Sequence, residues 1–194
     1  GPSSGANFDA EVFIKYFGFD NSAYRANRSD YSIDDWFDML YKDIIKLVEI
    51  GVDELQIESL KVLPGTKMRK EAKDLELKYS PLPPYEVLRT PAMSPDELRT
   101  AMQLSRTIDL YYNAEPWQKI IRELICSDED FLLTFTKHLK EMMVLDSPIS
   151  MERRGVILYE YCRSHYPERL SDVAIAWIQG GFSLKKAPAG NITK

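Results

Sequence analysis

Residues 94–113 read SPDELRTAMQLSRTIDLYYN and contain a complete start signal for a helix. Ser94 can cap the first turn, Pro95 suits the first helical position, and Glu97 can bond back to the cap. One side of the helix that follows carries mostly apolar side chains at intervals of three and four residues: Leu98, Met102, Ser105, Ile108 and Tyr112. The stretch therefore predicts a helix from Ser94 to Asn113.

Helical periodicity continues from this stretch towards the end of the chain. It predicts further helices at residues 117–125, from Ser127 and Asp130 to about residue 143, at 150–165 and at 170–179. Ser150 is expected to cap the third of these, Pro167 to end it, and Gly180 with Gly181 to end the last. Residues 94–194 are therefore predicted to form a helical bundle domain.

A helix followed by a strand is predicted upstream of this domain. Residues from about 33 to 50 carry an apolar stripe with helical spacing, and Gly51 follows the last turn. The stripe consists of Trp36, Phe37, Leu40, Ile44, Leu47 and Val48. In residues 54–63, Leu55 and Ile57 alternate with polar neighbours, which predicts a strand. Residues 9–17 and 67–75 are expected to form short helices.

Four prolines separate the two regions: Pro81, Pro83, Pro84 and Pro91. Because proline fixes its own backbone and favours extended geometry before it, residues 79–93 are expected to be an extended connector. The fold class is thus mainly α, with a helix–strand–helix segment at 8–78 before the connector. The predicted strand needs a partner, from the amino-terminal residues, from a second copy in a homodimer, or from a missing part of a longer protein.

Composition narrows the class of protein. The 194 residues carry a net charge of -5, so no bulk positive field attracts nucleic acid. Two cysteines without metal-ligand spacing and the lack of a long apolar run favour a cytoplasmic protein with no membrane partner. Residues 1–7 are small and polar, and we expect them to be a cloning remnant or a disordered end.

The residues that could take part in catalysis or metal binding all have simpler structural interpretations. His138, Cys126 and Cys162 lie among apolar neighbours at helical spacing, and His165 lies near a helix end. The carboxylates Asp34, Asp35, Asp38 and Asp43 are expected to form a solvated helix face, and Trp36, Trp117 and Trp177 to pack in a core. No nucleotide, protease or hydrolase motif is present, so no catalytic residue, metal site or cofactor is predicted for this chain.

Three short stretches carry a family resemblance. Residues 58–68 read ESLKVLPGTKM, residues 83–88 read PPYEVL, and residues 111–113 read YYN. In order and spacing they resemble the carboxy-terminal region of cobalamin-binding-domain radical S-adenosylmethionine proteins, including the domain of unknown function that follows their barrel. The likeness runs from about Tyr31 to the end, including GFSLKKAP at residues 181–188.

The resemblance implies that the helix before Gly51 and the strand after it form the last helix–strand unit of the barrel. The turn after this strand would lie near the adenosyl ligand. The resemblance therefore implies that the cofactor is contacted by Lys61, Pro64, Gly65 and Thr66. The simpler alternative is a plain turn in which Thr66 caps the next helix. Substrate or domain contacts are expected from Tyr85, Glu86, Tyr112 and Asn113, which could equally tie the connector to the helices.

One departure from the family decides what the chain can do. The CxxxCxxC motif that holds the family's [4Fe–4S] cluster is missing, as are the rest of the barrel and the cobalamin-binding domain. The expected function is a non-catalytic accessory domain that completes or covers the barrel of a longer radical S-adenosylmethionine enzyme. The alternatives are an independent helical protein-interaction module and a small hydrolase or metal enzyme that uses the acidic helix.

Overall fold

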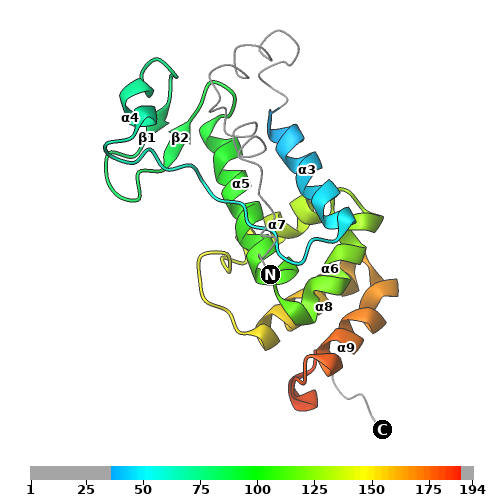
Figure 1. Cartoon of the computed structure of the whole chain (residues 1–194). Helices are drawn as coiled ribbons and strands as arrows, with labels where there is room; N and C mark the ends of the chain where they lie inside the picture. Colours follow the sequence, from blue (N-terminus) through cyan, green and yellow to red (C-terminus); the bar gives the residue numbers. More distant parts are fainter. Residues whose placement is uncertain (1–35, 189–194) are drawn as a thin grey trace, which may run out of the picture. The chain divides into compact units, whose positions relative to one another are not determined.

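The computed structural model describes residues 36–188 of the chain. Within that range it contains seven α-helices, α3 to α9, and a sheet of two short strands, β1 and β2 (Figure 1). The prediction of a mainly α protein is confirmed. The helix predicted at residues 9–17 and the end at 1–7 lie outside the described residues.

The described residues divide into two compact units. Unit 1 holds residues 36–44 and 58–101, and unit 2 holds residues 45–57 and 102–188. Helices α3 (Trp36–Ile50) and α5 (Pro95–Thr107) each contribute residues to both units. The predicted domain boundary at residue 94 is a different division of the chain and stays a prediction.

Helix α3 forms where the apolar stripe predicts it. Leu40, Ile44 and Val48 are buried, while Trp36 is only half-buried. Gly51 ends the helix with φ of 82°, and its amide donates to the carbonyl oxygen of Leu47 at 3.1 Å. Glycine adopts this left-handed backbone conformation more easily than other residues, which explains why the helix ends here.

The predicted strand at residues 54–63 needs a correction. Its backbone is extended, but the only ladder contact within the described range is a bridge between Lys61 and Glu86. The two paired strands are instead β1 (Lys78–Tyr79) and β2 (Val87–Arg89), which run antiparallel. The sequence pattern of residues 54–63 reflects alternating burial rather than a regular ladder: Leu60 and Val62 are buried, while Lys61 and Leu63 are exposed.

The proline-rich segment is also not a simple extended arm. It turns at residues 80–86 and returns as β2 beside β1, so it forms a hairpin, with α4 (Lys67–Glu71) nearby in Figure 1. This segment supplies the bridge to Lys61, a partner that none of the three predicted sources includes. Prolines restrict the turn without preventing the residues on either side from pairing.

The core of unit 1 is small and aliphatic. It consists of Leu60, Val62, Ala72, Leu77 and Val87, with Met68, Leu75, Tyr79 and Leu98 packed against it. These residues come from the extended segment, from α4 and the turn after it, from the hairpin and from the start of α5. The core therefore joins elements that are each too short to be stable alone.

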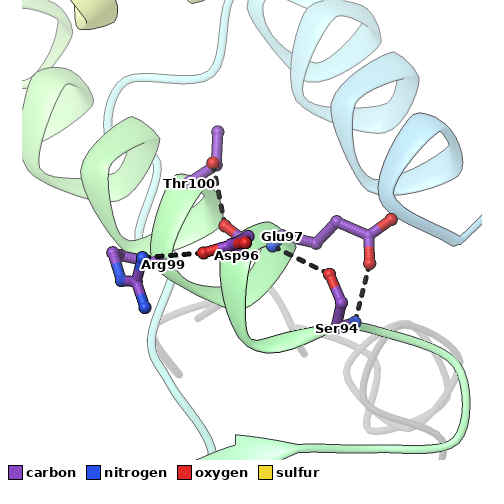
Figure 2. A network of polar contacts seen from close by, with 5 residues as sticks. All are labelled: Ser94, Asp96, Glu97, Arg99 and Thr100. Atoms are coloured by element: carbon purple, nitrogen blue, oxygen red, sulfur yellow. Dashed lines mark hydrogen bonds and ion pairs between the residues drawn. The ribbon is translucent and has the colours of Figure 1, made fainter.

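Helix α5 starts with the predicted capping box (Figure 2). The Glu97 amide donates to Ser94 Oγ at 3.3 Å, and the Ser94 amide donates to Glu97 Oε2 at 2.6 Å. Asp96 also pairs with Arg99, at 2.7 Å between Oδ1 and Nη1. Two of the unpaired donors of the helix start are thereby satisfied within four residues of sequence.

The predicted helix does not continue as an α-helix to Asn113. Residues Ile108–Tyr112 form a π-helix, in which the Asn113 amide donates to the Ile108 carbonyl oxygen at 2.9 Å. The wider turn buries Ile108, Leu110, Tyr111 and Tyr112 together. Apolar side chains at four of five successive positions can be buried at once only because the helix changes its period.

The other helices of unit 2 are close to their predicted ranges. They are α6 (Glu115–Ser127), α7 (Phe131–Glu141), α8 (Met151–His165) and α9 (Leu170–Gln179). The predicted Ser150 cap is confirmed, because its Oγ accepts from the Arg153 amide at 3.1 Å. Pro167 follows the end of α8 and begins a short 3-10 turn, Pro167–Arg169.

Aromatic rings fill the core of unit 2. Trp117 and Trp177 are buried as predicted, and Phe182 stacks on Trp117 with ring centroids 5.5 Å apart. Gly155 on α8 is needed for space, because a Cβ there would lie 2.4 Å from the Trp117 ring. The phenol of Tyr111 lies edge-on to Phe135 at 4.9 Å. Ring packing thus links α6, α8, α9 and the π-helix.

Within residues 36–188, no helix combines the length and the apolar character that are needed to cross a membrane.

Candidate functional site

The structure separates the eight site residues that the sequence suggests. Lys61, Pro64, Gly65, Thr66, Tyr85 and Glu86 lie in unit 1, whereas Tyr112 and Asn113 lie in unit 2. Each group is described by itself below.

The unit 1 residues gather around the bridge between Lys61 and Glu86. On either side of this pair, the Val62 amide donates to the Tyr85 carbonyl oxygen at 2.8 Å, and the Val87 amide donates to the Leu60 carbonyl oxygen at 2.9 Å. The Glu86 carboxylate accepts from Ser59 Oγ at 3.2 Å. The backbone of Tyr85 and Val87 and the side chain of Glu86 therefore hold the extended segment against the hairpin.

The turn at Pro64, Gly65 and Thr66 links this segment to α4. Thr66 Oγ1 donates to the Leu63 carbonyl oxygen at 2.7 Å and accepts from the Arg69 amide at 3.3 Å. Gly65 has φ of 83°, and a Cβ at this position would meet no atom within 4 Å. Thr66 thus has the capping role of the simpler prediction, and Gly65 is required by backbone conformation rather than by space.

Arg69 is a central residue of this group that the sequence analysis missed. Its guanidinium carbon lies 5.1 Å from the ring centroids of both Tyr79 and Tyr85, and its Nη1 donates to the Val62 carbonyl oxygen at 3.0 Å. Contacts of this kind combine cation–π attraction with a charged hydrogen bond. No local sequence signal predicts them, because the two tyrosines are brought together only by the hairpin.

The extended segment pairs with the hairpin along one edge, and its other edge forms no ladder with any described residue, although the Lys61 carbonyl oxygen on that edge accepts from the Leu63 amide at 3.1 Å. By the alternation of strand backbones, the amides of Ser59 and Lys61 face away from the hairpin. Among the described residues, these two amides form no backbone hydrogen bond. Lys61 pairs with Glu58 at 3.8 Å, and both side chains are substantially exposed. Charged side chains on an edge discourage unspecific pairing, and the homodimer expected through this edge stays a prediction.

Tyr112 and Asn113 bind backbone in unit 2. Asn113 Oδ1 accepts from the Leu55 amide and its Nδ2 donates to the Leu55 carbonyl oxygen, both at 2.9 Å. The Tyr112 hydroxyl donates to the Val52 carbonyl oxygen at 2.5 Å, and burial raises its pKa. Both side chains therefore hold residues 52–55 in place, so the stretch they bind is the one after α3 and not the proline-rich segment.

The cysteines differ from one another in the structure. Cys162 is buried in α8, where burial raises the pKa of its thiol to about 12. Cys126 is exposed at the end of α6, so the prediction of a buried core cysteine is wrong there. Its position in the last turn of the helix places it beyond the apolar stripe, which ends at Ile125.

Both histidines flank Tyr161. The ring of His138 lies 5.0 Å from that of Tyr161, and His165 stacks on it at 4.3 Å. Burial and the neighbouring His165 lower the pKa of His138. In the described part of the chain, no group of three or more His, Cys, Asp or Glu side chains could hold a metal ion. Asp34 and Asp35 of the acidic helix lie outside that part.

A groove with a volume of about 420 Å³ lies between α6 and α9. Its lining residues are Glu115, Pro116, Lys119, Ile120, Glu123, Asp172, Ile175, Ala176, Gln179 and Gly180. At one end, Arg169 binds Glu123 at 2.6 Å and Asp172 at 3.3 Å. The sequence analysis missed this groove, because its two walls are the partly polar sides of separate helices.

Residues 73–175 match the model of a family described as a protein of unknown function (DUF4080). The match covers more than half of the 194 residues. The chain belongs to this family. In this DUF4080 protein the matched residues include the hairpin, Tyr112, Asn113 and both walls of the groove down to Ile175. Neither a curated protein nor a solved structure matches the chain.

Proposed function

We propose that this chain is a carboxy-terminal accessory region of a longer radical S-adenosylmethionine iron–sulfur protein, where it completes or covers the end of the barrel. The sequence resemblance described above motivates the proposal. The family match overlaps the same stretch of chain and carries no activity of its own. The chain itself would supply shape and water exclusion rather than chemistry.

The observation that carries the proposal is the one-sided pairing of residues 58–63. This segment is extended, bonded to the hairpin along one edge and without a ladder partner among residues 36–188 along the other, and it ends in the Pro64-Gly65-Thr66 turn. An extended segment of this kind is suited to join a sheet that another part of the polypeptide provides. In the proposal, the other edge pairs with the barrel, and the turn faces the adenosyl ligand.

The cysteines of this chain do not fit a [4Fe–4S] cluster. Cys126 is exposed on α6 and Cys162 is buried on α8, so they supply no set of three converging thiolates. The proposal therefore places the cluster, and any cobalamin, in the preceding part of the polypeptide. Lys61, Pro64, Gly65 and Thr66 are proposed as contacts of S-adenosylmethionine only in that longer protein.

The first test uses the full reading frame that contains this chain. The product is purified without oxygen, and its iron, sulfide and reductive cleavage of S-adenosylmethionine are measured. A CxxxCxxC motif upstream, together with a cluster and cleavage, supports the proposal. A frame that encodes no such motif and a product without iron would refute it.

A pair of glycine variants then tests the turn. Gly65 and Gly181 both have positive φ, of 83° and 71°, and a Cβ added at either position would have no atom within 4 Å. Gly65→Ala and Gly181→Ala therefore introduce similar backbone strain, on the order of 1 kcal/mol. In the full-length enzyme we expect Gly65→Ala to slow cleavage about tenfold (~1.4 kcal/mol) and Gly181→Ala to leave it within about twofold. Equal effects of the two variants would rule out a role of the turn at the cofactor.

A helical protein-interaction module is the second candidate function. The groove between α6 and α9 favours it, because this surface is concave and is formed entirely within unit 2. The reading-frame experiment distinguishes the two functions, because a reading frame that encodes no barrel leaves only the interaction module.

A further inference from the structure

We propose that the groove between α6 and α9 binds an amphipathic helix of a protein partner, one that carries an apolar side chain flanked by basic ones. The inference names a partner for the interaction module and does not depend on the radical-enzyme proposal. It rests on the length, the charge and the apolar floor of the groove.

The groove has the length of a short helical segment. Its α6 wall contains Glu115, Lys119 and Glu123, which follow one another at intervals of four residues and so lie along one face of the helix. At a rise of 1.5 Å per residue this wall is roughly 12 Å long. Because Arg169 joins Glu123 to Asp172 at the start of α9, the two helices run antiparallel along the groove.

Acidic side chains dominate the two ends of the groove. Three carboxylates line it, from Glu115, Glu123 and Asp172, against one ammonium group, from Lys119. Glu123 and Asp172 share the single guanidinium of Arg169. Glu115 forms no ion pair with any other described residue. Each end therefore keeps excess negative charge, which complements a basic partner and repels an acidic one.

The middle of the groove is apolar. Ile120 and Ala176 are buried and form its floor, while Ile175 is 51% exposed on the α9 wall. An exposed isoleucine beside a buried apolar floor leaves room for one or two apolar side chains of a partner. Helices that bind in grooves insert anchors of this kind at intervals of three or four residues.

The experiment uses the whole chain and a panel of labelled helical peptides. Each peptide is about 14 residues long, roughly four turns, with two leucines one turn apart and lysines about one turn before and after them, in three registers. A matched panel carries glutamate in place of lysine. Binding is measured by fluorescence anisotropy at low salt and at about 0.5 M salt.

We expect a lysine peptide to bind with a Kd of tens of micromolar, on the order of 10⁻⁵ M, and to weaken at high salt. Ile175→Ala should weaken binding about tenfold. Its control is Ile178→Ala, on the same helix, 56% exposed and outside the groove, which should change binding less than about twofold. Glu115→Gln should weaken binding about threefold, and Glu141→Gln on α7 should not.

Three results would overturn the inference. These are no saturable binding of any lysine peptide below about 1 mM, equal binding of the glutamate panel, and equal effects of Ile175→Ala and Ile178→Ala. Circular dichroism and thermal melting of each variant separate loss of binding from loss of folding. Failure here leaves the reading-frame test of the radical-enzyme proposal unaffected.

Discussion

Unit 1 and unit 2 are stabilised in different ways. Half of the twelve largest fully buried side chains among the described residues are rings, and all six lie in unit 2: Trp117, Trp177, Tyr111, Tyr112, Phe131 and Phe135. Unit 1 has a cluster of smaller aliphatic side chains, Leu60, Val62, Ala72, Leu77 and Val87, and none of its buried apolar residues within the described range is aromatic. Large rings bury more apolar surface per residue than these aliphatic side chains, so unit 2 draws more of its stability from packing.

Unit 1 is also stabilised by polar side chains that bind within it, as Tyr112 and Asn113 bind backbone in unit 2. Arg69 binds the Val62 carbonyl oxygen, and Thr90 Oγ1 accepts from the amides of Ala92 and Met93 at 3.1 and 2.9 Å. Glu86 accepts from Ser59. A region too small for a large core can therefore still keep an irregular backbone conformation, provided that its buried backbone groups form hydrogen bonds.

The largest expected effect tests the aromatic core of unit 2. Trp117→Ala should lower the free energy of unfolding by about 3–5 kcal/mol, because it removes a buried indole and leaves a cavity. Urea denaturation followed by circular dichroism measures the change. Leu88→Ala is the control, since Leu88 is 51% exposed and should cost less than about 0.5 kcal/mol. Similar costs for the two variants would contradict the packing account.

The next effect tests the polar links of unit 1. Arg69→Met keeps an apolar stem but removes the charge over Tyr79 and Tyr85 and the bond to Val62. We expect a loss of about 2 kcal/mol, concentrated in unit 1. Hydrogen exchange should accelerate in residues 78–89 and stay unchanged in α8.

A matched arginine variant controls for the loss of charge itself. Arg163→Met removes an exposed ion pair with Glu160 and should cost less than about 0.5 kcal/mol. If Arg69→Met costs no more than Arg163→Met, unit 1 does not depend on the arginine.

The capping box gives a smaller and more local effect. Ser94→Ala removes the acceptor for the Glu97 amide and should cost about 1 kcal/mol. Ser94→Asp should recover most of this loss, because aspartate also caps helices well. Since the cap lies at the start of α5, amide hydrogen exchange in Ser94→Ala should become faster in the first turn of that helix. A loss that Ser94→Asp does not recover would show a role other than capping.

The smallest expected effect is the contribution of His138 in unit 2 to the pH dependence of stability. Burial and His165 lower the pKa of His138 in the folded state below its ordinary value of 6.5. The unfolded chain therefore binds this proton more readily, so His138 lowers stability as the pH falls below about 6.5. His138→Gln should reduce the loss of stability between about pH 7 and 5.5, by a few tenths of a kcal/mol, in urea titrations.

A variant of Glu141 should change the pH dependence of stability in the opposite direction. Its carboxylate raises the pKa of His138, so Glu141→Gln should make the loss of stability at low pH steeper. Changes of the same sign in the two variants would show that the histidine is not responsible.

Local signals were sufficient to predict most of the helices. Ser94 and Glu97 define the start of α5 within four residues, Ser150 caps α8, and Gly51 ends α3. Thr66 also caps α4, as the simpler of its two predicted roles requires. Each of these features depends on neighbours in sequence, so the pattern of residues contains its cause.

Long-range partners could not be predicted in this way. The alternation of residues 54–63 predicts extended backbone but not its partner, which is Glu86 in the proline-rich hairpin. The period change at Ile108–Tyr112 and the bonds from Asn113 to Leu55 follow from packing between residues 58 positions apart. Cys126 is exposed in the last turn of α6, whereas Cys162 is buried in α8.

The sequence by itself determined that the chain is mainly helical, where most helices begin and end, and that no cluster or nucleotide motif is present. These properties depend on residue type and on spacings of a few positions. Only the tertiary structure decided that Arg69 lies against two tyrosines, that one edge of residues 58–63 has no ladder partner among residues 36–188, and that α6 and α9 enclose an acidic groove. Such features arise where distant segments meet, and short-range periodicity contains no information about which segments will do so.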